Sequence, residues 1–264
     1  MKIKKAVVTG GSSGIGLAIC ENLLKTGAEV YSISRNHEKI QPKENLHLLK
    51  LDLSNLNAVC DFGTNFIKKY GVPDLLINNA GYGAFYEWKE FPQKEIESQI
   101  NVLFTAPTLL CKSFAPLMAT NEKGVIVNIT SLATLYPLPF MPLYNAGKSA
   151  LSSFSQSMML EYRDYPRWID FRLGDICTSF NESAPKQKPE LQSEIMKNAW
   201  LQIEKQLNES PSANFAAKQI ITSIIEERSC TKYGGGFFQA FLAPFLYRFL
   251  KPELLLKILK YRYR

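Results

Sequence analysis

Short apolar runs that alternate with amphipathic helical patterns constrain this chain more than any other feature of its sequence. Such alternation is typical of βαβ units, in which parallel strands form one sheet that helices cover on both faces. We expect strands at residues 6–8, 28–33, 46–51, 74–77, 125–129 and 169–173. We expect helices up to about residue 26, around Tyr144, and at 55–70, 94–119, 191–207, 215–227 and 253–264. The sequence therefore predicts a doubly wound α/β fold.

The length of 264 residues suits one large α/β domain. No internal repeat or low-complexity linker divides the chain, so we expect a single domain over residues 1–264. The contents of 46% hydrophobic and 21% charged residues are those of a globular protein, which excludes the disordered and fibrous classes.

The charge and the cysteine content limit the partners and the cellular compartment that we expect for the protein. The net charge of +7 comes from scattered basic residues without a nucleic-acid-binding motif, so we expect no nucleic-acid partner. Five widely spaced cysteines and only two histidines predict free thiols in a reducing cytoplasm and no metal site. The N-terminus lacks a signal-peptide pattern, and no run of about 18 apolar residues predicts a membrane span.

A glycine-rich segment, residues 9–16 (Thr-Gly-Gly-Ser-Ser-Gly-Ile-Gly), lies between the first predicted strand and its helix. Glycines in this context let the backbone approach a pyrophosphate, while the helix N-terminus supplies amide donors. The segment predicts a phosphate-binding turn, and the alternative is an ordinary tight turn.

Tyr144 and Lys148 are four residues apart, which places both side chains on one face of a helix. An ammonium beside a phenol favours the phenolate, so this spacing predicts a lowered pKa for Tyr144 and an accessible proton for a carbonyl oxygen. Tyr247 and Lys251 repeat the spacing without other signs of chemistry. Tyr144 differs because a predicted buried strand ends nearby in Ser131, at the carboxyl edge where open α/β sheets bind ligands.

Taken together, the motifs resemble the short-chain dehydrogenase/reductase family. They are the Thr-Gly-x-x-x-Gly-x-Gly loop, the Asn-Asn-Ala-Gly run at 78–81, Ser131, and the Tyr-x-x-x-Lys pair, in the family's order over residues 4–178. The resemblance implies a doubly wound (Rossmann) sheet of about seven parallel strands that binds NAD or NADP.

The resemblance also implies four catalytic residues. Tyr144 matches the acid/base, and Ser131 matches the hydroxyl that holds and polarises the substrate carbonyl. Lys148 matches the residue that lowers the tyrosine pKa and holds the nicotinamide ribose, and Asn101 matches the asparagine that positions a proton-relay water. Individually, Asn101 could be an ordinary helix residue and Ser131 a turn residue.

The cofactor contacts follow in the same way. Asp52 matches an aspartate beside the adenine, and Asn78 and Gly81 match the segment that flanks the adenosine ribose. Gly174 and Thr178 match the turn after the sixth strand, although Leu173 replaces the family's proline. The residues expected to bind the cofactor are Thr9, Gly10, Ser12, Ser13, Gly14, Ile15, Gly16, Ser34, Arg35, Asp52, Leu53, Asn79, Ala80, Gly81, Tyr144, Lys148, Gly174, Ile176 and Thr178.

The end of the second predicted strand favours NADP over NAD. An NAD enzyme places a carboxylate there for the ribose hydroxyls, whereas this chain has Ser34 and Arg35 and no acidic residue before Glu38. A hydroxyl and a cation suit a 2′-phosphate. NADP-binding members often carry a second basic residue where this chain has Ser13. Cytosolic NADPH favours reduction of a ketone to an alcohol.

The composition of the segments that follow the motifs bears on the kind of substrate. Apolar and aromatic residues follow both motif segments, and they predict either a lipophilic pocket or core packing: Tyr82, Phe85, Leu132, Leu135, Tyr136, Phe140 and Met141. The polar segment 175–212 is expected to be a substrate lid or a variable surface loop.

The tail, residues 237–264, is apolar up to residue 250 and ends in a basic amphipathic helical pattern. Such a helix can lie in a membrane interface. The alternatives are docking on its own domain or on a partner subunit. Lipid-ketone reductases of the ketosphinganine and hydroxysteroid type in the family favour a lipid substrate.

The sequence therefore predicts an NADPH-dependent reductase of a lipophilic ketone. The alternatives on the same fold are a catalytically idle NADP-binding sensor and a membrane-surface interaction protein. The resemblance implies a homodimer or homotetramer formed through the helices at 95–119 and 143–163.

Overall fold

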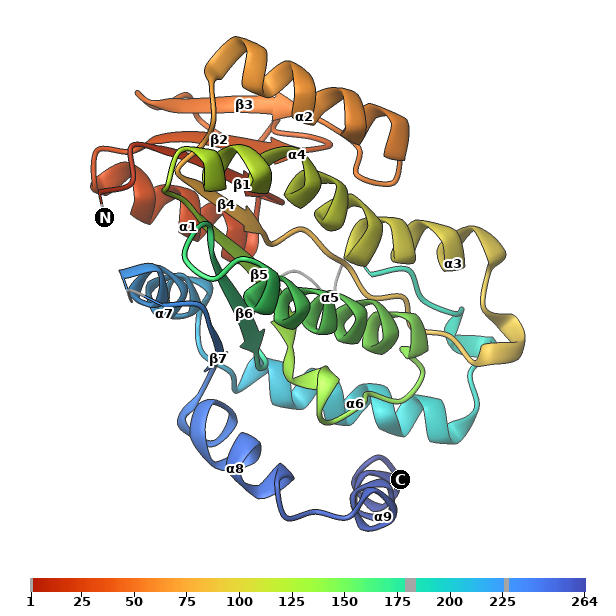
Figure 1. Ribbon diagram of the computed structural model, residues 1–264. Coiled ribbons are helices and arrows are strands. Elements are labelled where there is room, and N and C mark those ends of the chain that lie inside the picture. The colour runs from red at the N-terminus through yellow and green to blue at the C-terminus, as the bar shows by residue number, and fades with distance from the viewer. Residues whose placement is uncertain (1, 179–183, 226–227) are drawn as a thin grey trace.

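The computed structural model describes residues 2–178, 184–225 and 228–264. Its centre is one parallel seven-stranded sheet in the order β3-β2-β1-β4-β5-β6-β7 (Figure 1). The strands are β1 Lys5–Thr9, β2 Glu29–Ser34, β3 Leu46–Lys50, β4 Leu75–Asn78, β5 Val125–Ser131, β6 Arg167–Leu173 and β7 Cys230–Gly234. The six strands predicted from apolar runs are confirmed.

The seventh strand, β7, could not be predicted from the hydrophobic pattern. Its residues Cys-Thr-Lys-Tyr-Gly are mostly half-buried at the edge of the sheet, where only one side is paired. It is held by parallel pairing with β6, in which Gly234 lies opposite Leu173.

Helices cover both faces of the sheet, as the alternation predicted (Figure 1). The α-helices in the described residues are α1 Gly14–Lys25, α2 Leu56–Tyr70, α3 Gln93–Ile100, α4 Ala106–Thr120, α5 Pro142–Glu161, α6 Glu194–Asn208, α7 Ala213–Ile225, α8 Ala243–Tyr247 and α9 Pro252–Arg262. Successive strand residues point to opposite faces, so Val8 packs in a core with α1 and α7, whereas Val7 packs in a core with α2 and α4. The predicted helix at 215–227 corresponds to α7, and its last two positions lie outside the described residues.

The helix expected at 94–119 is confirmed, but it contains a π-helical turn, Asn101–Thr105, between α3 and α4. By length and composition alone, Gln93–Thr120 is a helix that could cross a membrane. Here it packs on the sheet, with Leu110 and Phe114 fully buried in the core that it shares with α2.

The tail lies beyond the carboxyl ends of β6 and β7, next to α6 (Figure 1). It forms a π-helical turn, Phe238–Leu242, followed by α8 and α9. The tail docks on its own domain, one of the expected alternatives. Tyr136 donates a hydrogen bond to the Ala243 carbonyl (2.7 Å), and the Asn198 amide donates to the Arg264 carbonyl (2.9 Å). Of the expected lid at 175–212, residues 179–183 lie outside the described part of the chain.

Candidate active site

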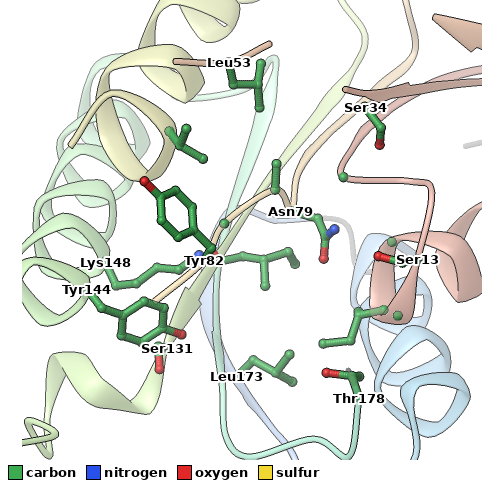
Figure 2. A pocket seen from close by; sticks show the side chains of 18 of the residues that line it. Ser13, Ser34, Leu53, Asn79, Tyr82, Ser131, Tyr144, Lys148, Leu173 and Thr178 are labelled. Atoms are coloured by element: carbon green, nitrogen blue, oxygen red, sulfur yellow. The ribbon is translucent and has the colours of Figure 1, made fainter. Parts of the chain in front are cut away.

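A cleft of about 640 Å³ runs along the carboxyl ends of the strands, where the order of a doubly wound sheet reverses beside β1 (Figure 2). Nearly all the residues predicted to bind a cofactor or react line this cleft, although they come from seven separate segments. They are Gly10, Ser12, Ser13, Gly14, Ile15, Gly16, Ser34, Arg35, Asp52, Leu53, Asn79, Ala80, Gly81, Ser131, Tyr144, Lys148, Gly174, Ile176 and Thr178.

The glycine-rich turn has the geometry that an anion site needs. Gly10 adopts a left-handed φ of 68°, and a Cβ on Gly16 would lie 2.7 Å from the Gly10 carbonyl carbon. These positions therefore require glycine. The N-cap residue of α1, Ser13, makes no capping hydrogen bond with its side chain, which leaves the first amides of the helix available to a ligand.

Two expected cofactor contacts lie behind the wall of the cleft instead of lining it. The Thr9 side chain is 1% exposed, and its hydroxyl accepts hydrogen bonds from the amides of Asn79 and Ala80, both at 3.0 Å. Asn78 donates to Asn128 inside the sheet at 2.8 Å. Both residues shape the turn after β4, and Asn79 faces the cleft (Figure 2).

The Ser131 and Tyr144 hydroxyls converge at the end of β5 (Figure 2) and form a hydrogen bond. Ser131 is the last residue of β5, and its oxygen also accepts a bond from the Ala133 amide at 3.0 Å. Tyr144 lies in the first turn of α5, which begins at Pro142 because proline suits that position. A carbonyl oxygen placed between the two hydroxyls could receive two hydrogen bonds.

The prediction that Lys148 lowers the pKa of Tyr144 is wrong for this structure, in which the pKa of Tyr144 is raised. Burial raises the pKa of Tyr144, the Ser131 hydrogen bond opposes that rise, and the charge of Asp175 adds to it. Burial also lowers the pKa of Lys148 to about 8, and its Nζ donates to the Ile129 carbonyl at 2.6 Å. The spacing prediction ignored desolvation, which disfavours both charged forms in a dry site.

Asn101 begins the π-helical turn and does not line the cleft. Its amide donates to the Ser54 carbonyl at 3.1 Å and thereby joins this helix to the segment after β3. The next residue, Val102, lines the cleft.

A buried carboxylate beneath the site was not predicted. Asp170 on β6 is fully buried and accepts bonds from Ser152 (2.7 Å) and from Arg172 Nε (3.0 Å). Burial has the largest effect on the pKa of Lys148 and lowers it, whereas the charge of Asp170 has the next largest effect and raises it. The sequence signal for it is an acidic residue inside an apolar strand.

The end of the cleft beside Tyr144 and Met141, where a substrate is expected and which is called the substrate end below, is mostly apolar and only partly matches the expected residues. Of the seven aromatic and apolar candidates, Tyr82 and Met141 line the cleft. The other five are not among the lining residues: Phe85, Leu132, Leu135, Tyr136 and Phe140. Phe85 and Phe140 pack in one cluster with residues of α6, and Tyr136 bonds to the tail. Leu138 also lines this end, together with four residues of the segment 175–212 that was expected to be a substrate lid or a surface loop: Asp175, Pro185, Ile203 and Leu207.

Asp175 connects the substrate end of the cleft to the tail. Its Oδ2 accepts a bond from Gln239 of the tail at 2.6 Å and another from Gln206 of α6. Arg262 of α9 in turn donates to Gln206. Burial raises the pKa of Asp175, while the two amide donors and Arg262 lower it.

The end of β2 carries a polar group without a partner. The Ser34 hydroxyl is buried and makes no hydrogen bond within the described part of the chain, and exposed Arg35 follows it on the cleft wall. An unpaired buried hydroxyl is costly, so it fits a site that a polar ligand group completes.

Comparison with known proteins agrees with this geometry. A family model described as short chain dehydrogenase matches residues 4–188. The chain is 31% identical to 3-ketodihydrosphingosine reductase of Bacteroides thetaiotaomicron over 67% of this chain and 65% of that protein. It is 33% identical to very-long-chain 3-oxoacyl-CoA reductase of Mus musculus over 60% of this chain and 54% of that protein. The matches thus span less than two thirds of these relatives.

Solved structures show the same fold. A short-chain dehydrogenase from Streptomyces avermitilis superposes with a TM-score of 0.80 at 22% identity, covering 92% of each chain. A metagenomic short-chain oxidoreductase in complex with NADP superposes with a TM-score of 0.60 at 34% identity, covering 65% of this chain and 81% of that one.

Proposed function

Because this chain belongs to the short-chain dehydrogenase/reductase family, we propose that it is an NADPH-dependent oxidoreductase that reduces a lipophilic ketone to an alcohol. The observation that carries the proposal is the hydrogen-bonded pair of Ser131 and Tyr144, with Lys148 buried beside it, in a cleft that continues to the glycine-rich turn.

In the proposed mechanism, the Ser131 hydroxyl donates a hydrogen bond to the substrate carbonyl oxygen and thereby polarises the carbonyl. When bound, the nicotinamide supplies the hydride that the carbonyl carbon accepts. Tyr144 delivers its proton to the carbonyl oxygen as negative charge develops there, which completes the alcohol. Since burial raises its pKa, Tyr144 is held as a proton donor at neutral pH.

Lys148 would hold the nicotinamide ribose, as its place in the family motif suggests. Burial lowers the pKa of Lys148 to about 8. Ribose hydroxyls would solvate its ammonium and so oppose this effect of burial. A charged Lys148 would then favour the Tyr144 phenolate after proton transfer. Asn101 enters as a positioning residue for the relay water that returns the proton, from its place at the π-helical turn.

The unpartnered Ser34 hydroxyl and the adjacent Arg35 support NADP over NAD. The 2′-phosphate of NADP would accept a bond from each, whereas the carboxyl end of β2 offers no carboxylate for the ribose of NAD. The metagenomic relative at 34% identity was solved with NADP.

The substrate assignment has two supports. The substrate end of the cleft carries Leu138, Met141, Ile203 and Leu207, which suit an aliphatic chain. The relatives named for 3-ketodihydrosphingosine and very-long-chain 3-oxoacyl-CoA share a keto group on a lipid. We therefore infer a keto lipid rather than a small polar ketone.

We also propose that the protein is cytoplasmic and forms a homodimer or homotetramer. All five cysteines are free, which suits a reducing cytoplasm. The exposed sides of α4 and α5, which carry Leu117 and Leu160, are the proposed contacts of a homodimer or homotetramer.

The test is consumption of NADPH, with NADH in parallel, against keto lipids, ketosteroids and small soluble ketones. Tyr144→Phe removes the donated proton but keeps the ring, so turnover should fall about 10²–10⁴-fold with NADPH affinity unchanged. Turnover of keto lipids that is lost in the variant supports the proposal. Tight NADPH binding without turnover of any ketone would instead favour the catalytically idle binding protein.

A further inference from the structure

The tail carries more than half of the exposed large hydrophobic side chains in the described part of the protein. Among the described residues, twenty-one large hydrophobic side chains are exposed, and twelve of these belong to the last 28 residues. They are Phe237, Phe238, Phe241, Leu242, Phe245, Leu246, Tyr247, Phe249, Leu254, Leu256, Ile258 and Tyr261. Such a concentration marks an interaction site, because scattered single exposures are the norm elsewhere on a surface.

An amphipathic segment on a protein surface normally turns its large apolar side chains toward the protein, but the tail turns them toward water. In its first part, the small side chains of Ala240 and Ala243 face the protein and are buried. The large rings point outward and pair with each other, Phe237 with Phe241 at 5.4 Å and Phe245 with Phe249 at 5.2 Å between centroids. Folding of this chain alone leaves these rings in water.

The charge of the tail identifies the kind of partner. Six basic residues and one acidic residue give it +5 of the chain's net +7, and all seven are exposed. The basic residues are Arg248, Lys251, Lys257, Lys260, Arg262 and Arg264. A surface that is both apolar and cationic complements an anionic lipid surface, whereas two such tails would repel each other.

The tail is anchored beside the substrate end of the cleft. Gln239 donates to Asp175, which lines the cleft, and Tyr263, which follows α9, packs in the same apolar cluster as Tyr144. Figure 1 shows α8 and α9 beyond the carboxyl ends of β6 and β7. Leu173 and Gly174, at the end of β6, line the cleft.

We propose that the tail is a docking surface for an anionic lipid bilayer and that it seats the substrate end of the cleft at the bilayer. A lipophilic ketone then reaches Tyr144 from lipid rather than from water. Only this second statement rests on the proposed function, because docking itself requires neither substrate nor cofactor.

The docking is tested by sedimentation of the full chain with vesicles of phosphatidylcholine, with and without phosphatidylglycerol. We expect binding to the anionic vesicles that weakens with added salt, since exposed charges are screened. The double variant Lys257→Ala/Lys260→Ala should bind about 25-fold more weakly, about five-fold for each cation removed.

The apolar contribution is tested with Phe241→Ser/Phe249→Ser, which should lose vesicle binding about ten-fold or more. Ile225→Ser on α7 is the matched control, because Ile225 is 73% exposed and Phe249 is 72% exposed. Circular dichroism and thermal unfolding should be the same for all variants, since these side chains support no core.

Equal vesicle binding by the wild type and both double variants would overturn the proposal. So would a full chain that ignores anionic vesicles but self-associates in sedimentation velocity, with the association lost in Phe241→Ser/Phe249→Ser. That result would assign the tail to a second copy of this chain.

The access statement is tested by turnover of one ketone presented in two ways. In Phe241→Ser/Phe249→Ser, kcat/KM should fall at least about ten-fold for a long-chain ketone embedded in anionic vesicles and stay unchanged for a short soluble analogue. Equal kcat/KM ratios in wild type and variant would refute bilayer access. Absence of turnover in both presentations would refute the proposed function and leave docking intact.

Discussion

An alanine at position 16 should separate α1 from the glycine-rich turn and weaken both folding and NADPH binding. The added Cβ would lie 2.7 Å from the Gly10 carbonyl carbon and 2.6 Å from Asn79 Nδ2, and closer still to the Gly10 oxygen. Ordinary contacts begin near 3.4 Å, and the Gly10 atoms are backbone, so the turn or the helix has to move.

The magnitude follows from two opposing effects. Overpacking of this kind costs about 1–3 kcal/mol, and the backbone contact places Gly16→Ala at the upper end. Alanine gains about 1 kcal/mol over glycine in a helix, which leaves a net destabilisation of about 2 kcal/mol. Displacement of the first amides of α1 should also weaken NADPH binding at least about ten-fold, because those amides are the proposed phosphate donors.

Urea unfolding and NADPH titration by fluorescence measure the two effects. Gly236→Ala is the control, because the nearest atom to its added Cβ is 3.8 Å away and its φ is not left-handed. If Gly16→Ala matched Gly236→Ala in both free energy of unfolding and NADPH affinity, the close approach of α1 to the turn would not be the feature that forms the site.

Three further predictions concern charge. Arg35→Asp should weaken NADPH binding about 10–100-fold, because one charge-assisted hydrogen bond is lost, and should leave NADH binding unchanged. Equal losses of affinity for both cofactors in titrations would contradict the NADP assignment. Lys148→Met should abolish turnover yet raise stability by about 1–3 kcal/mol at pH 7, because burial lowers the pKa of Lys148 from 10.5 to about 8. The unfolded chain binds the proton more tightly between these values, so wild-type stability should rise from pH 8 to 10.5 and the variant should lack that rise in thermal melts. Asp175→Asn removes a charge that raises the Tyr144 pKa, so the loss of reductase activity at alkaline pH should begin at lower pH, and an unchanged profile would refute this coupling.

Local patterns were sufficient for much of the fold and most of the cleft. Apolar runs identify strands such as β4 and β5 because buried parallel strands need hydrophobic side chains on both faces. The glycine spacing and the Tyr144–Lys148 pair are local constraints, since each joins residues within one turn or helix. For that reason most predicted cofactor residues line the cleft.

Features that depend on distant neighbours were predicted less well. Strand β7 has too little apolar character to be recognised before β6 is in place beside it. Thr9 and Asn78 belong to the motifs, but whether a motif residue faces the cleft or the sheet depends on the pairing of β4 with β1 and with β5.

The sequence by itself determined the order of six of the seven strands, the glycine-rich turn, and the presence of Ser131, Tyr144 and Lys148, because periodicity and short spacings encode them. Only the tertiary structure decided the electrostatics: burial raises the pKa of Tyr144, against the direction predicted from the spacing. It also decided which apolar residues line the cleft and which side of the tail faces water. These properties depend on desolvation and packing, and both arise from segments that meet only when the chain has folded.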